Sequence, residues 1–279
     1  MTTFPAPLIH PARGDLPVLL SVPHSGREYP AALIDLARGG TVALQSLEDP
    51  LVDRVAWRAL AAGCGAVVAQ TPRAAIDCNR AEDELDPSII SGVPRGPLSA
   101  RTRGGLGVVP ARTQAHGTLW RRPISLAELE RRLDQAHRPY HQAVSDALDA
   151  LVARFGCALL LDCHSMPPPG AGIGDVVIGD RRGRTAAHWL SHEALAITRA
   201  AGFAAGLNDP FAGGYVIARH ARPGRGVHGL QIELNRAAYL DPALRSPGPG
   251  FDRAAVLLER LAVELGEALL QRRFAVAAE

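Results

Sequence analysis

The sequence contains no lysine, so all 30 of its basic residues are arginine, and 28 acidic residues leave a formal net charge of only +2. A nucleic-acid-binding domain usually carries a strong local excess of positive charge. The chain shows no RNP motif, no helix-turn-helix pattern and no interleaving of basic and aromatic residues. We therefore interpret the arginines as scattered surface charges and expect no nucleic-acid partner.

Cysteine is scarce as well, and its spacing argues against a disulfide framework. The four cysteines are Cys64, Cys78, Cys157 and Cys163, and no two of them form a C-x-x-C pair. A chain of 279 residues with 47% hydrophobic residues is long enough to build a core without disulfides. Cys157 and Cys163 flank an apolar run, where a thiol packs as a small hydrophobic side chain.

Long hydrophobic segments are absent too. No apolar stretch approaches the roughly 20 residues that a membrane-spanning helix needs. The N-terminal segment MTTFPAPLIHPARGD lacks the charged region followed by an apolar region that is typical of a signal peptide. The sequence therefore predicts a cytoplasmic protein with no membrane partner, and it leaves the oligomeric state open.

What the sequence does contain is an alternation of short apolar runs and longer helical patterns. Runs this apolar are typical of strands that are covered on both faces. The predicted strands are Leu16–Val22, Ala66–Ala69, Cys157–Cys163, Val176–Ile178 and Gly229–Leu234.

Four segments show apolar positions at helical spacing. The predicted helices are Asp49–Ala62, Ser125–Phe155, Thr185–Ala201 and Asp252–Phe274. Ser125 and Glu128 form an S-x-x-E capping box, and Pro139 predicts a kink or a break in the second helix. Together the strands and helices predict a single α/β domain over residues 1–279, with a mixed, largely parallel sheet flanked by helices.

The stretch from about residue 81 to 123 interrupts this pattern. It is rich in glycine, proline and arginine and has little apolar periodicity. We expect an irregular loop insertion, which is either a surface excursion or a segment that closes over a binding site.

Three polar residues stand at or near the ends of predicted strands. His24 follows the first strand, His164 follows Cys157–Cys163, and Glu233 lies near the end of Gly229–Leu234. In open α/β sheets ligands bind outside the carboxyl ends of the strands, so these side chains are expected to converge there. Two imidazoles, a carboxylate and an open position form a common catalytic zinc arrangement.

The alternation of side chains along a strand refines this prediction. Asp162 and His164 point to the same face and Cys163 to the other, so Asp162 is expected to support His164. A further carboxylate comes from Glu48 or Asp49, and the local pattern alone favours Asp49 as the N-cap of a helix opened by Pro50.

Arginine residues are a second group of candidate site residues, because a planar guanidinium binds a carboxylate through two hydrogen bonds. Arg73 and Arg80 lie in the segment PRAAIDCNR and Arg236 lies in ELNRAAY, both beside predicted site segments. A buried arginine at a metal site suits an acidic amino-acid substrate. We favour Arg80, in its compact D-x-N-R element, and interpret Arg236 more readily as a surface charge.

These segments resemble the N-formylglutamate amidohydrolase family. The matching elements occur in the family's order over roughly residues 16 to 270. They are Pro23-His24-Ser25-Gly26, Glu48-Asp49 with Asp53-Arg54, Arg73-x-x-x-Asp77-x-Asn79-Arg80, Arg138-Pro139-Tyr140-His141, Asp162-Cys163-His164-Ser165, Gly213-Gly214-Tyr215 and Gln231-Ile232-Glu233-Leu234.

The resemblance implies a layout related to the zinc carboxypeptidases, a phosphorylase/hydrolase-like architecture. It implies hydrolysis of an N-acyl amino acid, with N-formyl-L-glutamate in histidine breakdown as the named substrate. It also implies that Zn²⁺, or another divalent metal, is held by His24, Asp49 and His164, with Glu233 as the general base.

The resemblance further implies that Asn79 and Arg80 bind the substrate carboxylate. Arg73, Tyr215 and Arg219 are additional candidates for substrate binding. Two alternatives stay open: a deacylase of the same build that acts on another N-acyl amino acid or small amide, and a non-catalytic binding protein.

Overall fold

A computed structural model of the chain describes residues 3–94, 96–170 and 172–277. The chain divides into two compact units, which we describe separately. Unit 1 comprises Met1–Leu8, Pro23–Glu48 and Val68–Gln142, and unit 2 comprises Ile9–Val22, Asp49–Val67 and Ala143–Glu279. The assignment of residues 1–279 to a single domain stays a prediction.

A seven-stranded sheet forms the centre of the fold. In order across the sheet its strands are β1 Leu8–His10, β3 Gly65–Val68, β2 Val18–Val22, β6 Ala158–Met166, β9 Val227–Asn235, β7 Val176–Gly179 and β8 Ala205–Leu207. β2 pairs in parallel with β6, β6 with β9 and β7 with β8, whereas β7 runs antiparallel to β9. The predicted mixed, largely parallel sheet is confirmed.

The apolar runs become strands because both of their faces are covered. Every residue of β2, β6 and β7 is buried. All five predicted strands are present, whereas β1 and β8, three residues each, were not predicted. Their sequences, LIH and AGL, are too short to form a recognisable apolar run.

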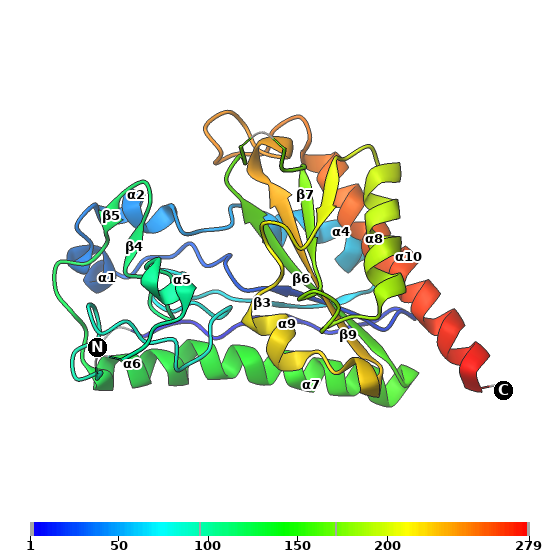
Figure 1. Cartoon of the computed structure of the whole chain (residues 1–279), viewed down its shortest axis with the longest axis horizontal. Coiled ribbons are helices and arrows are strands. Elements are labelled where there is room, and N and C mark those ends of the chain that lie inside the picture. The colour runs from blue at the N-terminus through cyan, green and yellow to red at the C-terminus, as the bar shows by residue number, and fades with distance from the viewer. Residues whose placement is uncertain (1–2, 95, 171, 278–279) are drawn as a thin grey trace. The chain divides into compact units, whose positions relative to one another are not determined.

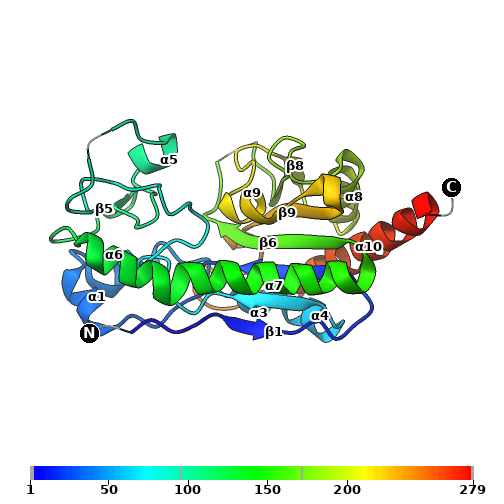
Figure 2. The ribbon, with the colours of Figure 1, turned by 90° about the horizontal axis from the view of Figure 1, so that it is seen from below.

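Helices flank the sheet of unit 2. The long helix α10 Phe251–Ala277 lies along α8 His188–Ala200 and also contacts α3 Val52–Val55, α4 Trp57–Ala61 and β6 (Figure 1). The short helix α9 Tyr215–His220 lies against β9 and β6 (Figure 2). A Cβ at Gly229 would lie 3.1 Å from the Cβ of Ala221, which follows α9, and 3.2 Å from the Cβ of Ile217 within it, so a larger residue there would push the helix or its side chains outward by a few tenths of an ångström.

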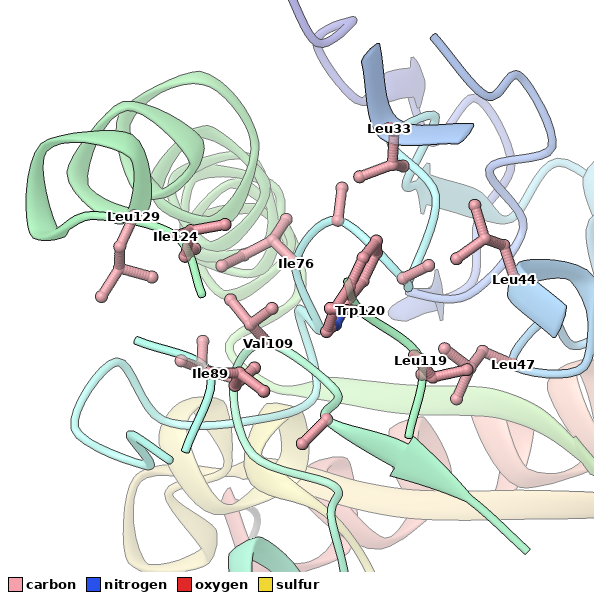
Figure 3. Close-up of a cluster of buried hydrophobic side chains, with 14 of the residues drawn as sticks. Leu33, Leu44, Leu47, Ile76, Ile89, Val109, Leu119, Trp120, Ile124 and Leu129 are labelled. Atoms are coloured by element: carbon pink, nitrogen blue, oxygen red, sulfur yellow. The ribbon is translucent and has the colours of Figure 1, made fainter. Parts of the chain in front are cut away.

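Unit 1 has a hydrophobic core of its own, which Figure 3 shows. Its elements are α1 Ala31–Leu36, α2 Gly40–Gln45, α5 Ala100–Arg103, β4 Arg112–Thr113, β5 Gly117–Thr118 and α6 Leu126–Arg132. In the described part of segment 81–123 (all but residue 95) the helices and strands are the short elements α5, β4 and β5, yet the segment supplies Ile89, Val109, Leu119 and Trp120 to this core. Its closure over a site stays a prediction.

The predicted helix 125–155 is divided. After α6 a π-helical turn, η1, spans Leu133–His137, and α7 runs from Arg138 to Phe155 with Pro139 in its first turn. The Ser125 hydroxyl caps α6 by accepting a hydrogen bond from the backbone N–H of Glu128 at 3.2 Å. The Glu128 carboxylate binds Arg131 and Arg132.

The remaining elements are the 3-10 turns η2 Pro223–Arg225 and η3 Arg236–Ala238. All four cysteines are buried and none forms a disulfide. Within the described ranges, no helix combines the length and the apolar character that crossing a membrane would require.

Candidate active site

Two neighbouring strands of unit 2 carry the central side chains in aligned rows. The register of β6 and β9 pairs His164 with Glu233 and Asp162 with Gln231. Paired residues on adjacent parallel strands lie roughly 4.8 Å apart and point to the same face. The expected proximity of His164 and Glu233 is therefore present. Both lie two residues inside their strands, which extend to Met166 and Asn235.

The imidazole of His164 is bonded on both sides by carboxylates. Its Nε2 lies 2.9 Å from Oδ2 of Asp162, and its Nδ1 lies 3.0 Å from Oδ2 of Asp49. Ligand atoms on a tetrahedral zinc lie roughly 3.3 Å apart when each is about 2.0–2.1 Å from the metal. The Nδ1–Oδ2 spacing therefore suits two ligands of one ion. Asp162 takes the supporting position that the strand alternation predicts.

These carboxylates also set the charge of the ring. Burial lowers the pKa of His164, but Asp162, Asp49 and Glu233 more than offset this effect and raise the pKa well above its usual value. An imidazole surrounded by carboxylates favours a positive charge at this place, which either a proton or a metal ion can supply.

Asp49 is not a helix cap. The helix α3 begins only at Val52, and its N-cap position is Leu51, which has a left-handed φ of 60° and no side-chain hydrogen bond to the helix. The cap that the local pattern favoured is therefore wrong, and the buried carboxylate contacts His164 instead. The neighbouring Glu48 lies in unit 1 and accepts a 2.5 Å hydrogen bond from Tyr29.

Arg236 is a site residue that the sequence interpretation placed on the surface. Its side chain is only 11% exposed, and its Nη2 donates to Oδ1 of Asp49 at 3.2 Å. Its Nε donates to the hydroxyl of Ser165 at 3.1 Å. Arg236 thus binds the oxygen of Asp49 that does not face Nδ1 of His164. The only sequence signal was its place three residues after Glu233.

Tyr215 and Arg219 lie one turn apart on α9. Arg219 donates from Nη1 to the Tyr215 hydroxyl at 2.8 Å. The next residue is His220, and burial, aided by the charge of Arg219, lowers its pKa to about 4. His220 is therefore neutral at pH 7.

In unit 1 the second histidine, His24, has a similar carboxylate partner. Its Nε2 lies 2.8 Å from Oδ1 of Asp77, which is fully buried. Arg73 donates to Oδ2 of Asp77 at 2.9 Å, and the backbone N–H of Asn79 donates to Oδ1 at 2.8 Å. Burial raises the pKa of Asp77, but Arg73, His24 and Arg80 together hold it well below its usual value.

The sequence interpretation did not identify Asp77 as the carboxylate that contacts His24. Asp77 belongs to the Arg73-x-x-x-Asp77-x-Asn79-Arg80 element, but nothing in that element indicates a contact with a histidine 53 residues earlier. The i, i+4 spacing of Arg73 and Asp77 does suggest their ion pair. The Nε of Arg73, a predicted substrate ligand, is therefore engaged by Asp77.

Arg80 is a buried cation held by backbone carbonyls. Its side chain donates from Nε to Leu106 at 2.8 Å and from Nη1 to Asn79 at 2.7 Å. Burial lowers the pKa of this guanidinium, although Asp77 opposes the shift. A desolvated arginine stays charged at neutral pH and binds an anion strongly, because the surrounding dielectric is low.

Asp49 and His164 in unit 2, and His24 in unit 1, are buried side chains of the types that ligate metal ions. Two imidazoles and one carboxylate are a donor set that suits a zinc-type ion with one coordination position left open. In both histidines the Nε2 atom is bonded to a buried carboxylate, which makes Nδ1 the donor for a metal.

A largely parallel sheet with a histidine bonded to buried carboxylates near the carboxyl ends of its strands is the arrangement of α/β proteins whose ligand sites lie at that edge. The sequence model of the family described as N-formylglutamate amidohydrolase matches residues 16–240. The chain belongs to the N-formylglutamate amidohydrolase family, as its sequence elements indicated.

Individual relatives agree with this assignment. The chain is 30% identical to an N-formylglutamate deformylase of Pseudomonas putida over 240 residues, which cover 82% of this chain and 84% of that one. It is also 30% identical to an N-formylglutamate deformylase of Pseudomonas aeruginosa over 241 residues, with the same coverage.

Two solved structures have a similar fold. The crystal structure of N-formylglutamate amidohydrolase from Ralstonia eutropha JMP134 superposes with a TM-score of 0.86 at 30% identity, covering 96% of this chain and 99% of that one. A gene product of Agrobacterium tumefaciens superposes with a TM-score of 0.69 at 19% identity, covering 96% of this chain and 94% of that one. The second likeness shows the fold alone.

Proposed function

We propose that this protein hydrolyses the amide bond of N-formyl-L-glutamate to formate and glutamate, using a divalent metal ion of the zinc type. The observation that supports this most directly is the pairing of His164 with Glu233 in a chain that belongs to this family. A candidate metal ligand and a candidate base lie side by side there.

We propose His24, Asp49 and His164 as the metal ligands. Asp49 and His164 already present ligand atoms 3.0 Å apart. His24 follows Val22, the last residue of β2, by two residues, and an extended residue spans at most about 3.6 Å. The covalent chain alone therefore keeps its Cα within about 7 Å of the end of a strand that pairs with β6.

A bound zinc-type ion would polarise the formyl carbonyl and lower the pKa of water toward about 7. Glu233 would accept a proton from the attacking water and deliver it to the departing amine nitrogen. Arg80, with Asn79 beside it, would bind a substrate carboxylate, which agrees with its desolvated, fully charged guanidinium. Tyr215 and Arg219 would contact the substrate from α9. The proposal also includes a cytoplasmic location for the protein.

The test measures metal content and formate release together. Purified protein is assayed for bound metal, and formate production from N-formyl-L-glutamate is followed in metal-replete and chelated samples. We expect about one metal ion per chain and formate release that stops after chelation and returns with zinc. Metal without formate would discard this substrate, and release of another acid from other N-acyl amino acids would identify the alternative deacylase. Absence of metal after reconstitution would contradict the proposal.

Glu233→Gln separates the roles of base and ligand. We expect turnover to fall by at least about 100-fold while metal content stays near that of the wild type. The control is Glu259→Gln in α10, which removes a carboxylate that contacts Arg58 at 3.8 Å. Loss of metal in Glu233→Gln would make Glu233 a ligand rather than a base.

A further inference from the structure

The strand β9 carries a buried glutamine directly beside the candidate base. Gln231 and Glu233 are two residues apart, so they point to the same face of the sheet. Across the register Gln231 pairs with Asp162, and Glu233 pairs with His164. Asp162 in turn pairs with Ser21 on β2 and accepts a 2.7 Å hydrogen bond from its hydroxyl. Ser21, Asp162 and Gln231 therefore form one polar row behind His164 and Glu233.

In this row the amide of Gln231 has both ends engaged. Its Nε2 donates to Oε1 of Glu233 at 2.8 Å, and its Oε1 accepts from the backbone N–H of Gly214 at 2.7 Å. Gln231 is 4% exposed and Glu233 is 8% exposed, so water competes little for these bonds. A backbone N–H can only donate, and therefore the oxygen of the amide must face Gly214. The N–H₂ end must then point at the Glu233 carboxylate, so the two possible amide orientations of Gln231 are distinguished.

The consequence is that one oxygen of Glu233 is fixed. A side chain such as glutamate has three rotatable bonds, and fixing them in advance removes an entropy cost at the moment of reaction. The bond to Gln231 holds Oε1 and thereby restricts the rotation of the carboxylate. Asp162 does the same for His164, which follows it by two residues.

The other end of the glutamine reaches the segment that begins α9. Gly214 is the N-cap residue of α9 and makes no side-chain hydrogen bond to the helix, because it has no side chain. Tyr215 and Arg219 follow on this helix. The orientation of Glu233 and the position of the Gly214–Tyr215 segment are thus linked through a single amide group.

We propose that Gln231 is a positioning residue that fixes the carboxylate of Glu233 and couples it to the Gly214–Tyr215 segment. The inference rests on the proposed function in that Glu233 is taken as the base. It assigns Gln231 no contact with the substrate.

Two substitutions separate the two ends of the amide. Gln231→Glu keeps an oxygen that can accept from Gly214 but replaces the amide donor by a carboxyl group, which repels the Glu233 carboxylate or shares a proton with it and in either case removes the free base. Gln231→Leu removes both hydrogen bonds and leaves a side chain of similar size. The readouts are kcat, KM, bound metal and the hydrogen-exchange rate of the Gly214 amide.

For Gln231→Glu we expect kcat to fall on the order of 10- to 100-fold, with KM, metal content and protection of the Gly214 amide close to those of the wild type. For Gln231→Leu we expect a similar loss in kcat, a higher KM and faster exchange at Gly214, because the segment is released. The control is Gln271→Leu, which changes an exposed glutamine of α10 and should leave all four readouts unchanged.

A double variant tests whether Gln231 acts through Glu233. In a Glu233→Gln background, Gln231→Glu should cause no further loss in kcat, since there is no base left to orient. Additive losses, or full activity in Gln231→Glu, would overturn the inference while leaving the proposed function intact. If the wild type releases no formate, the proposed function fails, and unchanged exchange at Gly214 in Gln231→Leu would separately overturn the coupling.

Discussion

Both candidate histidine ligands have one ring nitrogen bonded to a buried carboxylate. Asp162 bonds Nε2 of His164, and Asp77 bonds Nε2 of His24. Each carboxylate accepts a hydrogen bond from Nε2 and orients its ring, which leaves Nδ1 as the nitrogen that would bind a metal ion once it is deprotonated. Asp162 was predictable from strand alternation, whereas the Asp77 contact joins residues 53 positions apart and leaves no periodic signal.

The ion pair between Arg236 and Asp49 should affect zinc affinity. Because Arg236 binds Oδ1 of Asp49, it keeps Oδ2 turned toward His164. We expect Arg236→Ala to weaken zinc binding by about 10- to 100-fold, measured by competition with a chromogenic chelator. Arg236→Lys should recover only part of this loss, since an ammonium cannot bond Asp49 and Ser165 with one planar group.

The matched control for Arg236 is Arg58→Ala. Arg58 also forms an ion pair with an aspartate of unit 2, at 3.0 Å to Asp252, but that aspartate is 66% exposed. Exposed ion pairs contribute roughly 0–1 kcal/mol. Zinc affinity should therefore be unchanged in Arg58→Ala. Equal zinc affinities in Arg236→Ala and the wild type would show that Asp49 needs no support from Arg236.

At the scale of elements, the strands were predictable because their burial on both faces leaves continuous apolar runs. The short helices could not be predicted in the same way. The predicted helix 49–62 is divided into α3 and α4, and α9 has only six residues. The start of α3 depends on the left-handed φ of Leu51, which costs a residue with a side chain about 1–2 kcal/mol. Surrounding structure, not the local sequence, stabilises that conformation, so local capping rules placed Asp49 wrongly.

The start of α6 offers a stability test. Ser125→Ala removes the hydroxyl that caps α6 by accepting from the backbone N–H of Glu128, and we expect the free energy of unfolding to fall by about 1 kcal/mol. Ser125→Asp keeps an accepting oxygen and should restore most of this loss. Urea denaturation measures both variants, and equal loss in the two would mean that the hydroxyl contributes through packing rather than as a cap.

At the scale of the whole molecule, the alternation of strands and helices predicted the α/β class, and the order of short motifs indicated the family. The division into two compact units was not predictable. Unit 1 draws its core from dispersed residues such as Leu33, Ile76 and Trp120, which show no common period. Long-range packing of this kind has no local signature.

Metal binding should also change the stability of the whole protein. An ion that binds the folded chain stabilises it by about 2.7 kcal/mol at a free concentration 100 times the Kd. We expect zinc to raise Tm and a chelator to lower it. Asp49→Asn should reduce this shift because it removes a charged ligand. An identical Tm with and without zinc would contradict a structural coupling between the ion and the fold.

Finally, the buried cysteines have a practical consequence. Burial raises the pKa of Cys64 to about 11 and also raises the pKa values of Cys78, Cys157 and Cys163. Since the thiolate is the form that reacts, alkylating agents and air should leave the folded protein unmodified. Preparations can therefore omit mercaptans, which sequester zinc. A maleimide dye would then label a molecule only when it opens, and so would count unfolding events directly.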